Sequence, residues 1–198
     1  MTRDDGWSGL FATAFKQSRN AMALVDGQRR HVDVNGAYLQ LLGYAKSALI
    51  GRPIHRLVAG GPKGGGQEWA RVLAAGRFEG HTDLVRADGS VVAVAWGASA
   101  ETVTGRRLVL FVALSTSRRE RPVQTAVPAP PQGWSLSRRQ REVVRLVALG
   151  FTGPEIAEEL QLAHDTVRTH VRNAMATSGA RSRAHLVAIA LAGGHALR

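Results

Sequence analysis

A proline-rich break between residues 117 and 134 limits the chain to two separately folded parts. The break reads SRRERPVQTAVPAPPQGW and has little apolar periodicity. Such a segment favours extended polyproline II geometry and acts as a semi-rigid spacer. A structureless loop of this length is uncommon inside one compact domain. The 198-residue chain is therefore predicted to form one domain over 8–116 and another over 134–198, joined by a linker over 117–133.

The absence of cysteine excludes several kinds of site. Disulfides, Cys-ligated zinc, iron–sulfur clusters and a thiol nucleophile all need this residue. No apolar run reaches the roughly 18 residues of a membrane span, and the N-terminus lacks the apolar core of a signal peptide. We therefore expect a cytoplasmic protein with no membrane partner.

The formal net charge of +11 comes almost entirely from arginine, with 23 Arg against 3 Lys. Residues 1–116 carry a net charge of +5, and the shorter segment 117–198 carries +6. Bulk charge informs affinity for polyanions rather than fold. Its distribution makes the C-terminal part the candidate for nucleic-acid binding.

The first domain mixes strand-like and helix-like segments. Strands are expected at 21–26, 31–35, 78–86, 91–99 and 107–115, and helices at 36–42 and 67–75. Asn35 is a natural cap for the first of these helices. The sequence Ala87-Asp88-Gly89-Ser90 predicts a hairpin turn between the third and fourth strands. This order predicts an α+β fold with an antiparallel sheet.

Four motifs in this domain resemble the landmarks of PAS domains. They are Val34-Asn35-Gly36-Ala37, Leu42-Gly43-Tyr44, Leu49-Ile50-Gly51-Arg52 and Arg86-Ala87-Asp88-Gly89-Ser90. The resemblance implies a five-stranded antiparallel sheet whose concave face can enclose a small molecule, and it implies frequent dimerisation. Val92, Val94 and Trp96 share one strand face, which lines either a cavity or, the favoured interpretation, a packed core.

The resemblance leaves the PAS domain without an assigned cofactor. In the flavin-binding photosensors of this family, the flavin forms an adduct with a cysteine. This chain has no cysteine, so the cysteinyl-flavin adduct is excluded. Haem uses an axial ligand, and His31, His55 and His81 are the histidines available. The helix that supplies this ligand in haem-binding PAS domains corresponds to residues 67–75, which contain no histidine. Haem is therefore not expected, and these histidines are interpreted as ordinary core or surface residues.

The second domain contains four helix signals with clear start and stop residues. Ser137 with Gln140 and Thr152 with Glu155 form capping boxes, and Gly150 ends the first helix. The third helix is expected over 164–177, after a short turn at 161–163, and Ser182 caps the fourth. Two helices separated by a three-residue turn have the spacing of a helix-turn-helix.

The third helix has an apolar face and a polar face. Val167, Val171, Ala174 and Met175 recur at helical spacing and are predicted to face the core. The opposite face carries Asp165, Arg168, Thr169, Arg172 and Ala176. Arginine suits bidentate bonds to guanine, threonine can meet a base edge, and aspartate can accept from cytosine. The alternative is a merely solvated charged face.

The second domain strongly resembles the LuxR-type helix-turn-helix domain. The matching positions are Leu136-Ser137, Arg139, Arg141-Glu142-Val143, Gly150, Glu155-Ile156-Ala157, Leu160, Leu162, Thr166-Val167, His170-Val171, Gly179, Arg181 and Arg183. The resemblance implies that the third helix enters the major groove and that the fourth helix, with its small and apolar face, pairs two copies. Family positions that contact DNA correspond to Arg168, Thr169 and Arg172. With Asp165 and Thr166, they form the predicted DNA-binding set.

Four positions depart from the family pattern, two of them adjacent. The usual serine cap of the recognition helix is Ala163, a frequent Asn-Lys pair is Gly153-Pro154, and a usual lysine is Thr177. The last two changes remove expected phosphate contacts, each of which should flatten the log–log salt dependence by about one unit. Arg138, Arg139 and the arginines of the linker are candidates to replace them.

Together these patterns predict a non-enzymatic transcriptional regulator. It is expected to bind double-stranded DNA as a homodimer on a roughly palindromic operator, with a PAS domain that senses a small molecule or mediates dimerisation. RNA polymerase is a further candidate partner. No catalytic or metal-binding motif is present in the sequence. The alternative function is a PAS-based small-molecule sensor or scaffold whose basic C-terminal domain engages a protein partner.

Overall fold

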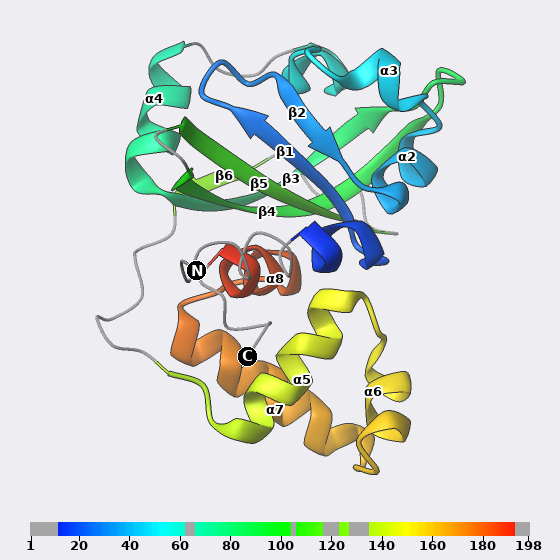
Figure 1. Cartoon of the computed structure of the whole chain (residues 1–198), viewed down its shortest axis with the longest axis vertical. Helices are drawn as coiled ribbons and strands as arrows, with labels where there is room; N and C mark the ends of the chain where they lie inside the picture. The colour runs from blue at the N-terminus through cyan, green and yellow to red at the C-terminus, as the bar shows by residue number, and fades with distance from the viewer. Residues whose placement is uncertain (1–11, 62–65, 104–105, 117–122, 127–134, 193–198) are drawn as a thin grey trace, which may run out of the picture.

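A β-sheet, with its own helices on one face, is stacked on the C-terminal helices, and the last of these lies against the sheet (Figure 1). The computed structural model describes residues 12–61, 66–103, 106–116, 123–126 and 135–192. None of the helices among these residues has the length and hydropathy needed to cross a bilayer.

The sheet has six strands in the order β2-β1-β5-β4-β3-β6, and all neighbouring pairs are antiparallel. The strands are β1 (Ala21–Asp26), β2 (His31–Val34), β3 (Arg77–Val85), β4 (Val91–Val103), β5 (Arg106–Ser115) and β6 (Val123–Ala126). The five expected strands and the α+β class are confirmed. The sixth strand lies in the segment predicted as a linker and adds an edge next to β3; the remaining linker residues lie outside the described ranges.

One face of the sheet is covered by the helices of the PAS-like domain. These are α2 (Gly36–Leu42), α3 (Lys46–Leu49), the 3-10 helix η1 (Ile54–Leu57) and α4 (Gly66–Ala75). The Asn35 side chain caps α2 by accepting from the amide of Tyr38, as predicted. Its amide nitrogen also donates to backbone carbonyls of residues 15, 18 and 20, which fixes α2 to the start of β1.

Four aromatic rings fill the part of this concave face beneath α4. Phe78 contacts Trp69, Trp96 and Phe111 edge-on, with ring centroids 5.9–6.3 Å apart. Trp69 stacks on Phe111 at an interplanar angle of 10°. Val92 and Val94 are buried on the same face of β4 as Trp96. The favoured prediction, a packed core at these three residues, therefore agrees with the structure.

The C-terminal part consists of α5 (Arg138–Leu149), α6 (Gly153–Glu159), α7 (His164–Ser178) and α8 (Arg183–Ala192). Both predicted capping boxes form, at Ser137 with Gln140 and at Thr152 with Glu155. Gly150 ends α5 in the left-handed region, at φ 94°. The predicted four-helix architecture is confirmed.

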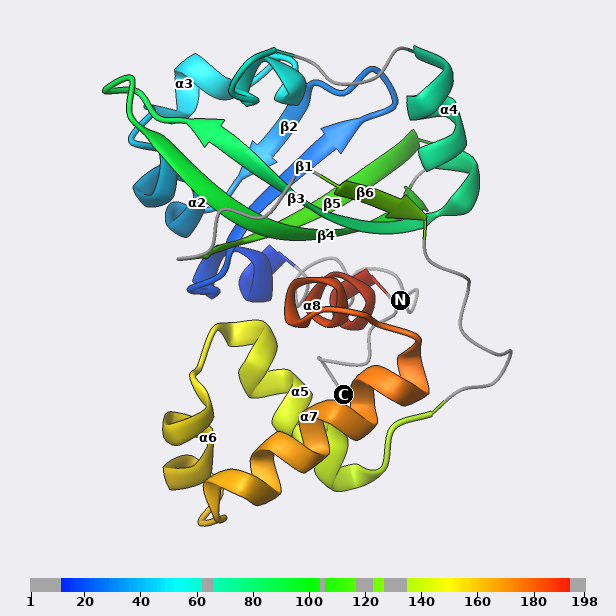
Figure 2. The ribbon, with the colours of Figure 1, turned by 180° about the vertical axis from the view of Figure 1, so that it is seen from behind.

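Helix α8 lies between the helical bundle and the outer face of the sheet (Figure 2). Its residues 184–191 are all buried, none more than 1% exposed. The resemblance implied that this helix pairs two copies. In the structure its small and apolar surface is instead covered by α5 and α7 on one side and by β4 and β5 on the other.

Candidate nucleic-acid interface

Helices α6 and α7 form the predicted helix-turn-helix. The Thr152 side chain and its amide both bond the Glu155 side chain, which fixes the first turn of α6. Gln161 adopts a positive φ of 52° in the turn, and the amide of Leu162 donates to the carbonyl of Ala157. These bonds set the angle between the two helices before any partner binds.

Helix α7 is anchored along one face only. Val167 and Ala174 are 1% and 0% exposed and pack into the core of the bundle. Val171 and Met175 were predicted to share this environment, but they are only half-buried and pack at its margin. The prediction for these two residues is therefore only partly right, because the helix lies at the edge of the bundle.

The opposite face of α7 presents the predicted DNA-binding residues to solvent. Asp165, Arg168, Thr169 and Arg172 are exposed, and Thr166 is half-buried. The guanidinium of Arg168 lies 3.3 Å from the carboxylate of Asp165, one turn earlier, with both side chains largely exposed. Such an exposed pair stabilises little. The arginine is therefore free to exchange this partner for a base or a phosphate.

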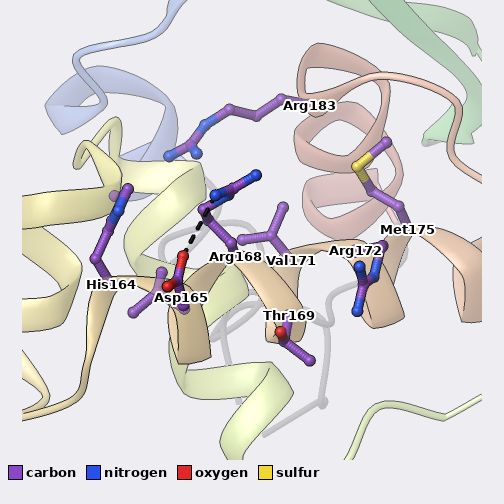
Figure 3. A pocket seen from close by; sticks show the side chains of 10 residues that line it. His164, Asp165, Arg168, Thr169, Val171, Arg172, Met175 and Arg183 are labelled. Carbon is purple, nitrogen blue, oxygen red and sulfur yellow. Dashed lines mark hydrogen bonds and ion pairs between the residues drawn. The ribbon is translucent and has the colours of Figure 1, made fainter.

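A groove of about 610 Å³ runs along α7 (Figure 3). It is lined by Gly153, His164, Asp165, Val167, Arg168, Thr169, Val171, Arg172, Met175 and Arg183. The predicted residues Asp165, Arg168, Thr169 and Arg172 thus lie together on one concave surface. Thr166 does not line this groove.

Sequence reasoning missed two contributors to this surface. Arg183 extends from the start of α8 toward Arg168 (Figure 3) and donates to the carbonyl of Phe151. His164 packs so closely on Gly153 that a Cβ at this glycine would lie 2.5 Å from the imidazole Nε2. The departure from the family pattern at Gly153 therefore makes room for His164, a relation that only the distance between two helices reveals.

The first helix of the bundle supplies arginines that are already paired. Arg139 bonds the Glu142 carboxylate and the carbonyl of Leu160, which joins α5 to α6. Arg138 contacts the same carboxylate at 3.3 Å. The bond from Arg139 lowers the pKa of Glu142. Arg139 is held in place by the fold, whereas Arg138 has 90% of its side chain exposed and is the more available of the two.

Helix α7 begins without a side-chain cap. Ala163 occupies the cap position in an extended conformation and makes no side-chain hydrogen bond. The carboxylate of Asp165, in the first turn, pairs with the guanidinium of Arg168. The first turn of α7 therefore lacks the acceptor that a capping side chain would supply, and the amide of Thr166 donates to the carbonyl of Ala163 instead.

The three histidines of the PAS-like domain lie in different elements, and His31 is held by hydrogen bonds within the core. His31 is 1% exposed, and its ring nitrogens contact the carbonyl of Arg52 at 2.6 Å and the hydroxyl of Tyr38 at 3.2 Å. Burial lowers the pKa of His31 and raises that of Tyr38. His55 lies on η1, and His81 lies on β3. Within the described ranges, no group of three His, Asp or Glu side chains is placed to hold a metal ion.

Comparisons with known proteins match two families to different parts of the chain. A family model for the PAS domain matches residues 19–118, and one for bacterial regulatory proteins of the luxR family matches residues 134–190.

The similar proteins include two bacterial relatives of the C-terminal part. The transcriptional regulatory protein FixJ of Rhizobium meliloti is 43% identical over 60 residues, which are 30% of this chain and 29% of FixJ. The spore germination protein GerE of Bacillus subtilis is 42% identical over 52 residues, which are 26% of this chain and 70% of GerE. The chain thus spans less than a third of FixJ. Among solved structures, Vibrio cholerae VqmA is 19% identical with a TM-score of 0.40, covering 94% of this chain and 88% of that one.

Proposed function

The chain belongs to the PAS domain family and, over its C-terminal domain, to the luxR family of bacterial regulatory proteins, and from this premise we propose that it is a transcriptional regulator that binds double-stranded DNA in a sequence-specific way. Its relatives FixJ and GerE are named as a transcriptional regulatory protein and a spore germination protein. The proposal assigns DNA recognition to the C-terminal domain and a sensing or dimerising role to the PAS domain.

The exposed polar face of α7 carries this proposal. A helix fits the major groove of B-DNA, where each base pair presents its own pattern of donors and acceptors. Arg168 and Arg172 lie one turn apart on this face with Thr169 between them, and all three are exposed. Two guanidiniums can each bind the O6 and N7 atoms of a guanine, and the threonine can contact a base edge or a thymine methyl group.

We further propose that two copies bind together. Helix-turn-helix dimers place their recognition helices on half-sites about one helical turn apart, so the operator should be roughly palindromic. Asp165 and Thr166 complete the proposed contact set at the start of α7. The same proposal includes a small-molecule ligand bound by the PAS domain and a contact between the protein and RNA polymerase.

Selection of genomic fragments by the full-length protein tests this function. The wild-type chain should enrich one sequence motif, and the variant carrying both Arg168→Ala and Arg172→Ala should lose it. Arg56→Ala, which removes an exposed charge from η1 on the PAS-like domain, is the matched control and should retain the motif. If the double variant enriches the same motif, the assignment of these side chains is wrong. If the wild-type protein enriches none, a protein partner for the basic domain becomes the better account.

A further inference from the structure

His164, the first residue of α7, lies in the groove but has no part in the proposed contact set. Its side chain is exposed, and it lines the groove together with Arg168 and Arg172. The three residues are four apart along the helix, so they form one row on the same side of α7. At a rise of 1.5 Å per residue, the row is about 12 Å long. A third basic side chain therefore stands in line with the two proposed base-reading arginines.

The imidazole of His164 rests on the first turn of α6. A Cβ built on Gly153 would lie 2.5 Å from the Nε2 atom and 3.0 Å from the Cδ2 atom of this ring. A side chain at position 153 would force the ring to move, whereas glycine lets it pack against the α6 backbone. Figure 3 shows His164 at one end of the groove, with Arg168 and then Arg172 further along the helix. The contact between the two helices thus sets the position of the ring.

Helix α6 brings negative charge to this place. Its sequence, GPEIAEE, contains three glutamates and no basic residue. In helix-turn-helix proteins the first helix crosses the DNA backbone, so α6 approaches the phosphates without a cation of its own. Glu155 bonds Thr152 and pairs with Arg19, which engages one of these acids within the chain. His164 is a basic side chain that α7 places at the start of α6.

The other charges of the groove give a protonated His164 little support. Asp165, Arg168, Arg172 and Arg183 are the charged side chains that line the groove with it, and the carboxylate of Asp165 pairs with Arg168. A cation at the start of a helix is also unfavourable by itself, because the amide dipoles leave that end partly positive. A bound anion would relieve both effects. The charged form of His164 is therefore stabilised by a partner such as a phosphate.

The chemistry of imidazole makes such a contact depend on protons. Histidine is the side chain whose charge ordinarily changes between pH 5 and 8. The neutral ring has one N–H donor, whereas the protonated ring has two donors and a positive charge. A charge-assisted hydrogen bond to a phosphate oxygen is roughly twice as strong as a neutral one. Contacts to phosphates add affinity that is independent of sequence and dependent on salt.

We propose that His164 binds a phosphate of the DNA backbone in its protonated form, so that protons strengthen the binding of DNA. The inference rests on the proposed function, because it names a second ligand, the proton, for the same interface. Gly153 is the positioning residue, since it lets the imidazole lie at the start of α6. Arginine stays charged throughout this pH range, so Arg168 and Arg172 read bases at every pH. The pH therefore changes the affinity and not the choice of sequence.

Fluorescence anisotropy of the full-length protein at pH 8 and pH 6, over a range of salt concentrations, tests the inference. The duplexes are the selected operator and an unrelated sequence of the same length. Because a nearby opposite charge favours the protonated ring, the wild-type protein should bind both duplexes roughly fivefold more tightly at pH 6 for each copy bound. The log–log salt slope should steepen by about one unit for each copy. The ratio of the two affinities should stay constant, because phosphate contacts carry no sequence information.

Two variants of His164 separate its charge from its shape. His164→Gln keeps a hydrogen-bond donor without the titrating charge, so it should lose the pH response. His164→Arg is charged at every pH and should bind roughly fivefold more tightly than His164→Gln at both pH values. His55→Gln, on η1 of the PAS-like domain, is the matched control and should respond to pH as the wild-type protein does. His185 is the same in all four proteins, so its titration does not contribute to the differences.

Gly153→Ala tests the positioning role. The added Cβ meets the far end of a flexible side chain, so the ring should move while the fold is kept. Most of the pH response should then be lost although His164 is still present. Gly36→Ala is the matched control, because it also changes the first residue of a seven-residue helix and its Cβ meets nothing within 4 Å. It should keep the full response.

The inference is wrong if His164→Gln responds to pH as the wild-type protein does, or if His164→Arg binds no more tightly than His164→Gln at pH 8. A full response in Gly153→Ala would overturn the positioning role of Gly153. Failure of the proposed function has a different signature, since the wild-type protein would then bind every duplex equally well, and the unrelated duplex alone would test His164. A clear preference for the operator with no contribution from residue 164 would refute the inference alone.

Discussion

Helices α7 and α8 belong to the same small domain and differ in almost every property of their surfaces. Helix α7 buries Val167 and Ala174 and turns charged side chains to solvent, whereas α8 buries every residue from 184 to 191. The first has a free polar face and no side-chain cap, and the second has a serine cap, with the Ser182 hydroxyl accepting from the amide of His185.

This difference between α7 and α8 follows from whether the surface of each helix is polar or apolar. A polar face gains little by docking within the chain, since water solvates it well, so α7 remains open for an external polyanion. An apolar helix cannot remain open, because exposed apolar area is unfavourable. In this chain the PAS sheet covers that area. The apolar surface of α8 and the outer face of the PAS sheet are therefore in direct contact.

The largest effect should come from truncating α8 inside the shared core. Ile189 is fully buried, so Ile189→Ala should lower the free energy of unfolding by about 2–5 kcal/mol. Urea denaturation of the full chain measures it. Ile50→Ala, at a side chain that is 42% exposed, should lower it far less. Equal losses at the two positions would show that α8 is not packed as described.

The next effect concerns the open face of α7. Arg168→Ala and Arg172→Ala should each weaken binding to a selected operator by about 1–3 kcal/mol, because each removes a bidentate contact to a base. Fluorescence anisotropy of a labelled duplex measures the affinity. Stability should stay within about 0.5 kcal/mol, as is usual at exposed positions. A loss of folding with the loss of binding would mean that these arginines are structural.

The third prediction concerns His185, which lies where α8 packs on the sheet. Among the described residues, the charged groups next to His185 are Glu79 and Arg77 of β3 and Arg181 before α8. Strand β4 contributes the buried hydroxyl of Ser99, and β5 contributes apolar side chains. Burial, reinforced by the two arginines, lowers the pKa of His185 from 6.5 to about 4. This outweighs the Glu79 carboxylate, which lies 3.8 Å away and favours the charged ring.

Release of α8 should return this pKa to its ordinary value, so protons favour the released state. The contribution of His185 to the packing of α8 on the sheet is fully present above about pH 6.5 and is lost as the pH falls toward 4. Between pH 7 and 5.5 the docking equilibrium should fall roughly eightfold, or about 1.2 kcal/mol. Hydrogen exchange of α8 in the wild-type chain and in His185→Gln, compared at each pH, isolates this contribution. The same pH response in both proteins would assign it to another group.

The smallest expected effect is a gain in the stability of the C-terminal domain. Ala163→Ser should supply the missing cap of α7 and stabilise the domain by about 0.5–1 kcal/mol. Thermal unfolding measures the change. Ala176→Ser, at an exposed position inside the same helix, is the control and should be neutral or slightly destabilising. A gain at the second position, or none at the first, would contradict the role assigned to the cap.

Local signals predicted most of the fold. Asn35, Ser137, Thr152 and Gly150 mark helix ends because capping depends on residues within a few positions of each other, and all four cap as expected. Strand alternation likewise placed five strands. Strand β6 was missed because the composition of its segment is typical of a spacer, and its pairing with β3 is a contact between distant parts of the chain.

The docking of α8 could not be predicted from local patterns. Gly97 is an ordinary glycine within a strand until the helix that lies on it is known, and His185 gives no sign of burial in its sequence context. The small, apolar character of α8 was visible in the sequence, and it indicates that a partner exists without identifying it. The predicted DNA-binding set lies as expected on one exposed face, apart from the half-buried Thr166, and its role in base recognition stays a prediction.

Base recognition by α7 is tested most directly by combining a protein substitution with a base substitution. Affinities are measured for wild-type and Arg168→Ala proteins on the selected operator and on operators changed at one guanine at a time. The account predicts that the wild-type protein loses about 1–3 kcal/mol at one guanine in each half-site, and that Arg168→Ala no longer distinguishes that base. If Arg168→Ala retains full discrimination at every position, α7 does not read DNA through this side chain and the central claim fails.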